Sequence, residues 1–275
     1  MTRPPEPKSH IAVWAAIAAS LVIFAVLDFV FFPPPTLKIR TASTSEILAA
    51  HPAQKLFFRF APDPNIVIID FPSSREQAAT LDRATAFLMR QGIPHDRVLT
   101  NVELAAILRT SPAFDNAHAY SAADLVRFFR LMARDHVMPN REERQLQLLL
   151  RELHWSAPGA VGAIVALAPD QPLSHALANA AYFVSPAYAV YAQHFFHDTL
   201  TLPEQTRFTR FLAARGYDTD LTDLVVNETQ SLLCFTPAFD PTAIGLTPSQ
   251  IQSLRTRFLQ KIPLAWLIRS GGFAP

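Results

Sequence analysis

The sequence predicts a mostly helical α+β protein, and three observations support that class. Amphipathic stretches with apolar residues at helical spacing fill the chain from about residue 100 onward. Two short runs rich in Ile, Val and Phe, at 55–60 and 65–71, have the composition of β-strands. Half of the 275 residues are hydrophobic, so the chain can bury a sizeable core, as one large domain or two small ones.

An apolar segment precedes the part of the chain that is expected to be globular. Residues 11–27 carry no charge, and the apolar run continues past Asp28 to a proline triplet. About 20 apolar residues are enough to cross the hydrocarbon core of a bilayer. The sequence therefore predicts three N-terminal parts: a tail (1–10), a transmembrane anchor (11–32) and a linker (33–42). A cleaved signal peptide is the competing interpretation, but the run is long for one and lacks a small-residue cleavage site after it.

The charges that flank the apolar segment are nearly balanced. Arg3 and Lys8 precede it, and Lys38 and Arg40 follow it. The N-terminal amine tips the positive-inside rule toward a cytoplasmic N-terminus. We therefore expect a single-pass protein of the inner membrane whose globular domain faces the periplasm.

The globular domain is expected to span 43–275, with a subdivision into 43–115 and 116–275. In chain order, the first part should contain a helix at 43–50, strands at 55–60 and 65–71, and helices at 73–91 and 102–109. Ser73 or Ser74 can cap the long helix. The strand at 65–71 is apolar on both faces and therefore belongs inside a sheet.

The second part should be mainly helical. Its helices are expected at 121–135, 139–153, 173–197 with a break near Pro186, 203–215, 220–235 and 247–261, and a buried strand inside 159–168. We expect Ser121 to cap one of these helices and Thr247 or Ser249 to cap another, because their hydroxyls can accept from first-turn N–H groups.

Composition excludes several classes of function. The 24 basic and 23 acidic residues leave a net charge of +1, which predicts no nucleic-acid partner. A single cysteine, Cys234, rules out an intrachain disulfide and is expected to be a small buried side chain. Gly159 and Gly162 make neither a P-loop nor a dinucleotide fingerprint.

Two groups of carboxylates are expected to be solvated charges near helix starts. One is the pair Glu142-Glu143, and the other comprises Asp218, Asp220 and Asp223. Acidic side chains are favourable in the first turn of a helix, so neither group requires a catalytic explanation.

One helix carries the most informative motif, His175-Ala-Leu-Ala-Asn179. In an H-E-x-x-H helix, two His one turn apart hold zinc on one face, and the Glu between them acts as the general base. Here the first His is present, while Ala176 stands at the base position and Asn179 at the position of the second His. The motif thus has the layout of a zinc-peptidase helix without the residues that perform the chemistry.

A later helix extends this pattern. Tyr182-Phe183 and Pro186-Ala-Tyr188 follow the motif, and Asn227-Glu-Thr-Gln-Ser-Leu-Leu233 lies further along the chain. The segment 173–235 resembles bacterial zinc metallopeptidase-like domains of the gluzincin type. Members of that group combine an H-E-x-x-H-G-x-x-F helix, a Tyr-rich segment and a later Asn-Glu-x-Gln-Ala-x-Leu helix.

The resemblance implies a zincin-like helical domain with a degenerate site. It matches His175 to the first zinc ligand and Glu228 to the third, and Ala180 replaces the glycine of the family. It also suggests a set of binding candidates: Tyr182, Phe183, Tyr188, Asn227 and Gln230.

The two changed positions predict a site without metal. Zinc in such sites needs three protein ligands and an open position, and Asn is a poor substitute for imidazole. Losing a positioned general base alone costs about 10²–10⁴ in rate. We therefore expect no cofactor and no catalytic residue. The predicted function is that of a membrane-anchored pseudoenzyme that binds a peptide or protein partner, in a groove beside residues 173–183.

Two alternatives stay open at this point. The chain would be an active zinc-dependent hydrolase if His175 and Glu228 shared a metal with His194 or His197. It would be a structural envelope protein if its likeness to peptidases were accidental. The first observation that separates them is whether His175, Asn179 and Glu228 point into one common space.

Overall fold

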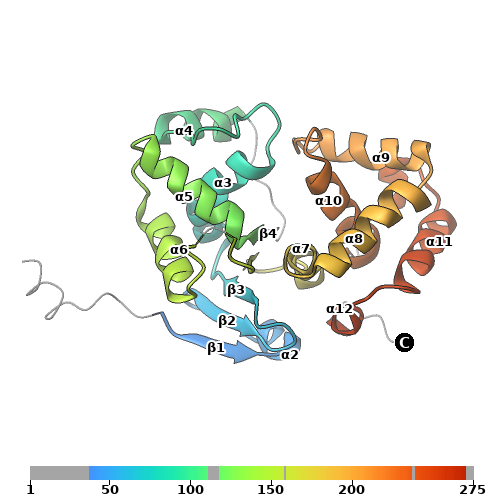
Figure 1. The fold of residues 1–275 in the computed structure, drawn as a ribbon, viewed down its shortest axis with the longest axis horizontal. Coiled ribbons are helices and arrows are strands. Elements are labelled where there is room, and N and C mark those ends of the chain that lie inside the picture. The colour runs from blue at the N-terminus through green and yellow to red at the C-terminus, as the bar shows by residue number, and fades with distance from the viewer. Residues whose placement is uncertain (1–36, 111–117, 158, 237–238, 271–275) are drawn as a thin grey trace, which may run out of the picture. The chain divides into compact units, whose positions relative to one another are not determined.

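The computed structural model describes residues 37–110, 118–157, 159–236 and 239–270 (Figure 1). The predicted tail and transmembrane anchor, residues 1–32, lie outside these ranges. Within the ranges, no helix has the length and apolar character needed to cross a membrane. Contacts group residues 38–275 into a single compact unit.

The described residues contain a mixed sheet of five strands. In chain order the strands are β1 (Ile39–Ala42), β2 (Leu56–Phe60), β3 (Ile66–Asp70), β4 (His118–Ser121) and β5 (Ala163–Leu167). Their order across the sheet is β1-β2-β3-β5-β4. The pairs β1–β2 and β3–β5 are parallel, and the pairs β2–β3 and β4–β5 are antiparallel.

Helices make up most of the remaining structure. They are α2 (Thr44–Leu48), α3 (Ser74–Met89), α4 (Asn101–Thr110), α5 (Ala122–Arg134), α6 (Arg141–Glu152), α7 (Leu173–Val184), α8 (Pro186–His194), α9 (Leu202–Ala213), α10 (Thr222–Phe235), α11 (Pro248–Leu259) and α12 (Ala265–Ser270). A π-helical turn, η1 (Phe195–Thr199), continues α8, and a short 3₁₀ turn, η2 (Pro241–Ile244), precedes α11. The predicted mostly helical α+β class is confirmed.

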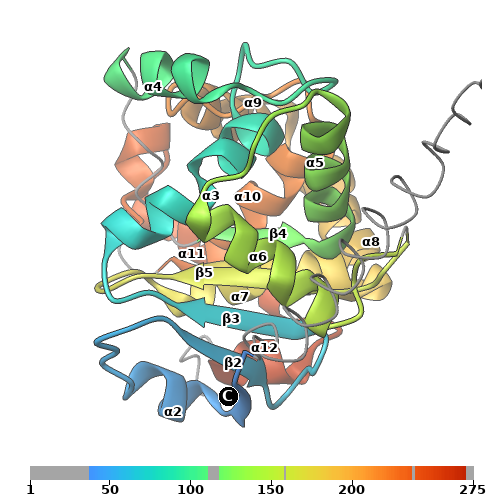
Figure 2. The ribbon, with the colours of Figure 1, turned by 90° about the vertical axis from the view of Figure 1, so that its left-hand side faces the viewer.

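Helices cover both faces of the sheet. Helices α3, α5 and α6 lie on one face, and α7 packs on the other, against β3, β4 and β5 (Figures 1 and 2). Every residue of β3 and of β5 is buried as a result. The prediction that the apolar run at 65–71 forms an interior strand is confirmed, because β3 lies between β2 and β5.

The helix starts follow the capping residues expected from the sequence. Ser73 accepts a hydrogen bond from the backbone N–H of Glu76, and Ser121 accepts one from that of Asp124. Thr247 caps α11 in the same way. Each of these side chains satisfies a backbone donor that has no partner inside its helix, which is why the helix begins there.

Three elements differ from the sequence expectations. Residues 39–42, expected to belong to the linker, form β1, which pairs in parallel with β2 and buries Ala42. Strand β4 and helix α12 were not expected. Strands β1 and β4 are each only four residues long. They form by pairing with strands distant in the chain and not because of a local periodic pattern.

Glu143 is buried, so the expectation that Glu142-Glu143 is a solvated pair is wrong for its second member. Helix α6 packs on α3, and the Arg83 Nε atom lies 2.9 Å from Glu143 Oε1, both side chains being almost fully enclosed. Arg83 also donates to the carbonyl of Leu99 (3.1 Å) and to the Asn101 side chain. Burial raises the pKa of Glu143 above its usual value, although Asn140 and Arg83 oppose that effect.

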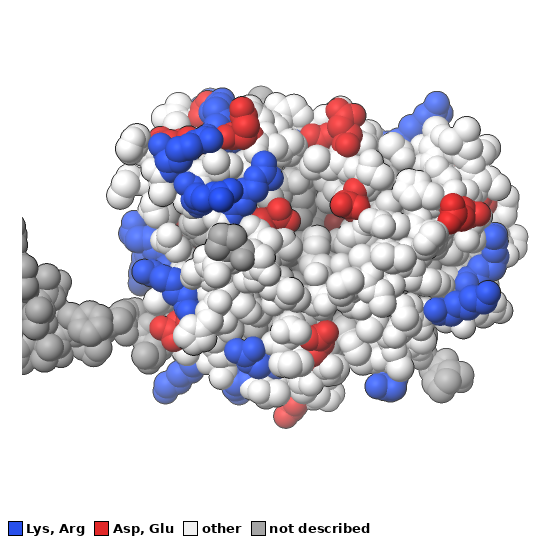
Figure 3. All heavy atoms as spheres, in the orientation of Figure 1, with Lys and Arg blue, Asp and Glu red and all other residues white. Residues whose placement is uncertain are grey.

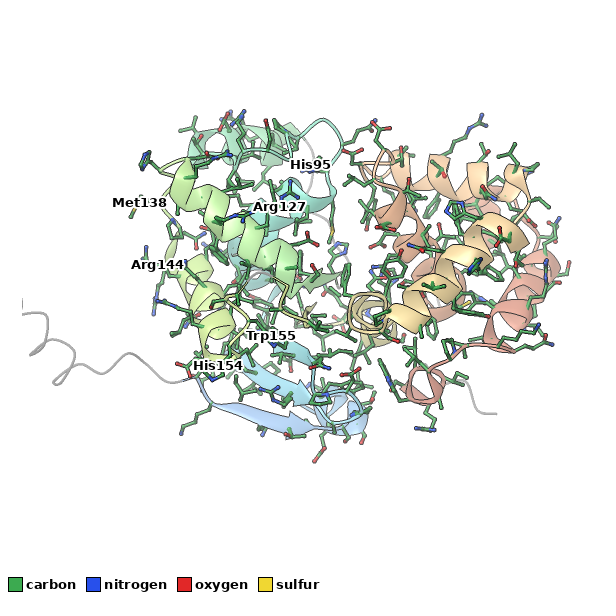
Figure 4. The ribbon with its side chains drawn as sticks, viewed as in Figure 1. His95, Arg127, Met138, Arg144, His154 and Trp155 are labelled. Carbon is green, nitrogen blue, oxygen red and sulfur yellow. The ribbon has the colours of Figure 1, made fainter. Side chains whose placement is uncertain are left out.

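A second polar contact joins the segment after α3 to the loop before α10. His95 Nε2 lies 2.8 Å from Asp218 Oδ2, and Arg127 of α5 donates to the carbonyl of His95 (Figure 4). The hydrogen bond with His95 lowers the pKa of Asp218, although partial burial opposes it. Asp218 is therefore a structural partner of His95 rather than the solvated charge that was expected.

Charged side chains are unevenly distributed over the face that Figure 3 shows. Lys and Arg gather over α5 and α6, with Asp and Glu among them, and wide uncharged areas lie between the charged groups. This pattern agrees with the nearly equal numbers of basic and acidic residues in the chain.

Gly162 lies against the ring of Trp155, which is labelled in Figure 4. A Cβ atom at position 162 would lie 2.5 Å from Cε2 of the ring, closer than real Cβ atoms approach. The substitution Gly162→Ala is therefore expected to lower the free energy of unfolding by about 1–3 kcal/mol, because the indole has to move in a packed core. Denaturant unfolding monitored by tryptophan fluorescence measures the change.

The control for this prediction removes the obstacle. In a background carrying Trp155→Leu, the added methyl group at position 162 should cost less than it does beside the intact indole. An equal cost in both backgrounds would show that the contact with Trp155 is not the cause.

Candidate functional site: a buried polar cluster between α7 and α10

His175 and Glu228 lie together between two helices that pack against each other. His175 comes from the first turn of α7, and Glu228 from the middle of α10. The His175 Nε2 atom is 3.4 Å from Glu228 Oε2, and the two side chains are only 3% and 2% exposed. The structure thus brings together the two positions that the resemblance matches to zinc ligands.

Asn179 occupies the space between these two side chains. Its Nδ2 atom donates to Glu228 Oε1 at 2.9 Å and lies 3.3 Å from His175 Nε2. The side-chain oxygen of Asn179 accepts a hydrogen bond from the Ser231 hydroxyl. An amide N–H₂ group therefore stands between the imidazole and the carboxylate, at the place where a cation would otherwise be held.

Thr236 sets the orientation of the imidazole. The Thr236 hydroxyl donates to the backbone carbonyl of Ser231 at 3.0 Å, so it accepts from His175 Nδ1, 2.8 Å away. The Nε2 atom is then the ring nitrogen that faces Asn179 and Glu228. A partner that fixes the tautomer in this way is the arrangement that metal-binding His residues usually have.

The network continues along α10 and reaches α8. Gln230 donates to Asn227 Oδ1 at 3.0 Å and to the Ser231 hydroxyl at 2.7 Å, and it accepts from the Tyr188 hydroxyl at 2.5 Å. Asn227 in turn donates to the backbone carbonyl of Asn179 at 3.4 Å. These polar groups satisfy one another inside the core, which makes the cluster rigid.

Burial and local charge oppose each other at Glu228. Burial alone would raise its pKa, but the hydrogen bond and charge of His175, together with the Asn179 amide, outweigh that effect and hold the pKa below its usual value. His118, on the edge strand β4, is close enough to interact with both residues. Burial lowers the pKa of His118 to about 4, so this imidazole is neutral at physiological pH.

The remaining binding candidates fall into two groups. Tyr188, Asn227 and Gln230 are buried members of the network. Tyr182 and Phe183 lie near the end of α7, where the Tyr182 hydroxyl donates to Asp223 Oδ1 at 3.0 Å and its ring contacts Phe183 edge to face. Only Phe183, half-buried, keeps an exposed part of its side chain larger than a few per cent.

Nearly all side chains of α7 are buried, so the helix itself offers little surface to a ligand along its length. An open cavity of about 680 Å³ lies instead at the amino end of α7 and is lined in part by Pro172 and Thr236. Thr236 thus lines this cavity and also contacts the buried cluster through its hydroxyl.

The side chains of the cluster do not fit zinc. Zinc needs three donors with lone pairs and an open position, whereas Asn179 presents its N–H₂ group to His175 and Glu228. Among the described residues, no three His, Cys, Asp or Glu side chains form a group that could hold a metal ion. The alternative ligand His194 is 72% exposed and lies 2.7 Å from Asp198, so it is not part of the buried cluster.

Three members of the surroundings were not expected from the sequence: Thr236, Ser231 and His118. Thr236 and Ser231 are common residue types with no distinctive spacing, so only the packing of α7 on α10 reveals their role. His118 lies on a strand that local pattern does not predict, and its position beside α7 follows from the sheet order.

No protein-family model matches this chain, and none of the curated proteins or solved structures compared with it matches either. The function therefore has to be inferred from the residues of the chain itself.

Proposed function

We propose that the chain is a membrane-anchored, catalytically inactive metallopeptidase-like protein that acts through binding. The observation that carries the proposal is the convergence of His175, Asn179 and Glu228 in one buried cluster. Residues 175 and 228 are far apart in the sequence, yet the imidazole and the carboxylate face each other across a single amide. A zincin-like origin accounts for this placement, because it requires a His on one helix and a Glu on a later one to share a small cation.

Two features support the absence of hydrolytic activity. Ala176, at the position of the general base, is a fully buried methyl group with no proton to exchange. The Asn179 amide fills the space between the remaining ligand positions and donates a hydrogen bond to Glu228. Hydrolysis at this site would need a positioned base and an activated water, and the residues present supply neither.

The membrane anchor and the periplasmic placement of the domain belong to the same proposal. They are supported by the uncharged run at 11–27 and by the flanking charges. A binding role is supported by the open cavity at the amino end of α7, which gives a ligand access to a position next to the cluster. The partner would be a peptide or a protein.

Metal loading tests this proposal directly. The full chain is equilibrated with zinc, dialysed and analysed for bound metal. We expect far less than one zinc per chain, because two ligands and an amide do not make a zinc site. One zinc per chain, lost in a Glu228→Gln variant, would overturn the proposal and favour the active hydrolase.

A further inference from the structure

The cavity at the amino end of α7 has a distinctive position in the fold. Strands β3 and β5 are parallel neighbours, and their last residues, Asp70 and Leu167, are paired in the register and both line the cavity. In sheets with parallel strands, the loops beyond the carboxyl ends of the strands are a preferred place for ligands. The volume of about 680 Å³ lies within the range of small-molecule sites.

Asp70 is the polar group that the surroundings leave unsatisfied. The residue is only 5% exposed, and its Oδ2 atom is buried without a hydrogen-bond donor in the part of the chain that the structure describes. No ion pair joins it to a Lys or Arg of those residues. A buried carboxylate without a partner is expensive, so one that lines a cavity points to a group that arrives from outside.

The surroundings of Asp70 also affect its titration. Burial raises the pKa of Asp70 to about 6, and His51 opposes the shift. Because the folded pKa lies above the unfolded value of 3.8, the folded state loses stability as the pH rises from about 4 to 6. At neutral pH the carboxylate is still mostly ionised, so it carries a charge that the protein does not neutralise.

The other lining residues restrict what can neutralise this charge. Most of the wall is apolar and comes from the α2 region, the end of β5 and the loop before α7: Ile47, Leu48, Ala50, Pro52, Leu167 and Ala168. The titratable side chains of the lining besides Asp70 are His51 and Asp170, and both lie exposed. The cavity therefore combines one buried negative charge with mostly apolar walls, to which Gln171 and Thr236 add neutral polar groups.

We propose that this cavity binds the ammonium group of an amine that carries an apolar body, with Asp70 as the anionic partner. An ammonium group has three donors, which match the unsatisfied oxygens of a carboxylate, and charge-assisted hydrogen bonds of this kind are strong. The apolar body covers the aliphatic walls. A small divalent metal ion fits less well, since it would require several oxygen ligands and the lining offers one buried carboxylate.

This inference does not depend on the origin of the His175–Glu228 cluster. Failure of amine binding would leave the metal-loading result untouched, and bound zinc would leave the chemistry of Asp70 unchanged. Thr236 is the residue that the two sites share, since its hydroxyl contacts His175 and it also lines the cavity.

Calorimetry with matched ligands tests the proposal on the full chain in a zwitterionic detergent. Phenethylamine is compared with phenethyl alcohol, which has the same apolar body and no charge. We expect the amine to bind and the alcohol to bind at least tenfold more weakly, which is about the worth of a hydrogen bond to a charged group. Equal affinities, or no binding of the amine, would overturn the proposal.

Variants locate the charge that the amine recognises. Asp70→Asn keeps the shape of the side chain and is expected to weaken amine binding at least about tenfold, with no effect on the alcohol. Asp170→Asn is the matched control, an exposed carboxylate on the same lining, and should change the affinity by less than about threefold because solvent screens it. A larger loss of amine affinity in Asp170→Asn than in Asp70→Asn would contradict the assignment of Asp70.

A second variant avoids any change to the buried residue. Leu48 is 56% exposed and lines the cavity, so Leu48→Arg places a competing cation at the entrance without disturbing the core. It should weaken amine binding while leaving the thermal melting curve unchanged. A folded Leu48→Arg protein with unaltered affinity would place the amine outside this cavity.

Two further measurements complete the test: the pH dependence of amine binding, and a comparison of a small amine with a peptide amino terminus. Amine affinity should fall as the pH is lowered through about 6, because Asp70 takes up a proton there, and the fall should persist in a His51→Gln variant. A dipeptide amide with a free amino terminus is then compared with its acetylated form. Preference for the free form identifies a peptide amino terminus as the source of the amine, and binding of phenethylamine alone identifies a small molecule. An affinity independent of pH would overturn the role of Asp70.

Discussion

Replacing Arg83 with leucine is expected to lower the free energy of unfolding by about 3–5 kcal/mol, since it breaks a buried ion pair by removing one partner. Glu143 is almost completely enclosed, and the guanidinium now lies 2.9 Å from its carboxylate. Without that partner, the carboxylate would stay charged and unpaired or would have to take up a proton. The carbonyl of Leu99 and the side chain of Asn101 would lose a donor in the same step. Denaturant unfolding of Arg83→Leu against the unmodified chain measures the loss.

Two companion variants show whether the buried pair is the cause. Arg75→Leu removes an exposed arginine from the same helix, α3, and should change the stability by no more than about 0.5 kcal/mol. The double variant Arg83→Leu, Glu143→Leu should be more stable than Arg83→Leu alone, because it leaves no unpaired charge in the core. A double variant that is no more stable than Arg83→Leu alone would contradict the explanation.

The substitution Asn179→His is expected to raise the affinity for zinc on the order of a hundredfold or more. It replaces the amide between His175 and Glu228 with an imidazole and so supplies a third ligand. The Nε2 atom of His175 already faces that space, because Thr236 accepts from Nδ1. The larger ring disturbs the packing, but bound metal stabilises the folded state by mass action. Metal analysis after dialysis, and the shift in melting temperature with added zinc, measure the gain.

Matched variants distinguish a rebuilt site from adventitious binding. Adding Glu228→Gln to Asn179→His should remove the bound zinc, whereas adding Glu142→Gln, at a position outside the cluster, should not. Peptidase activity is not expected from Asn179→His, because Ala176 still provides no base. A folded Asn179→His protein that retains no zinc would count against a zincin-like origin of the cluster.

The sequence predicts the helices and the interior strands well for physical reasons that act locally. Helix caps are local, because the hydroxyls of Ser73, Ser121 and Thr247 accept from the free N–H groups of the turn that follows them. The run that forms β3 is apolar on both faces and is therefore stable only inside a sheet. Strands β1 and β4 were missed because four residues carry too little periodicity, and partners distant in the chain create them.

The same distinction applies to the site. The meeting of His175 and Glu228 agrees with the resemblance to gluzincin-type domains, which matches these two residues to the first and third zinc ligands. Glu143 was misjudged because a first-turn acid looks identical whether the helix start faces water or an arginine on a neighbouring helix. Asp70 ends an apolar strand, and nothing in its sequence neighbourhood shows that a cavity lies beside it.

The packing of α7 has a consequence for substitutions at position 176. Ala176, Ala178, Ala180 and Ala181 are all fully enclosed, so neighbouring side chains already fill the volume that a longer residue at these positions would need. A glutamate at position 176 would bring a carboxylate into a place with neither room nor water. Ala176→Glu alone is therefore expected to destabilise the folded state without adding hydrolytic activity. A longer residue at position 176 would therefore demand coordinated replacements among the side chains that surround it.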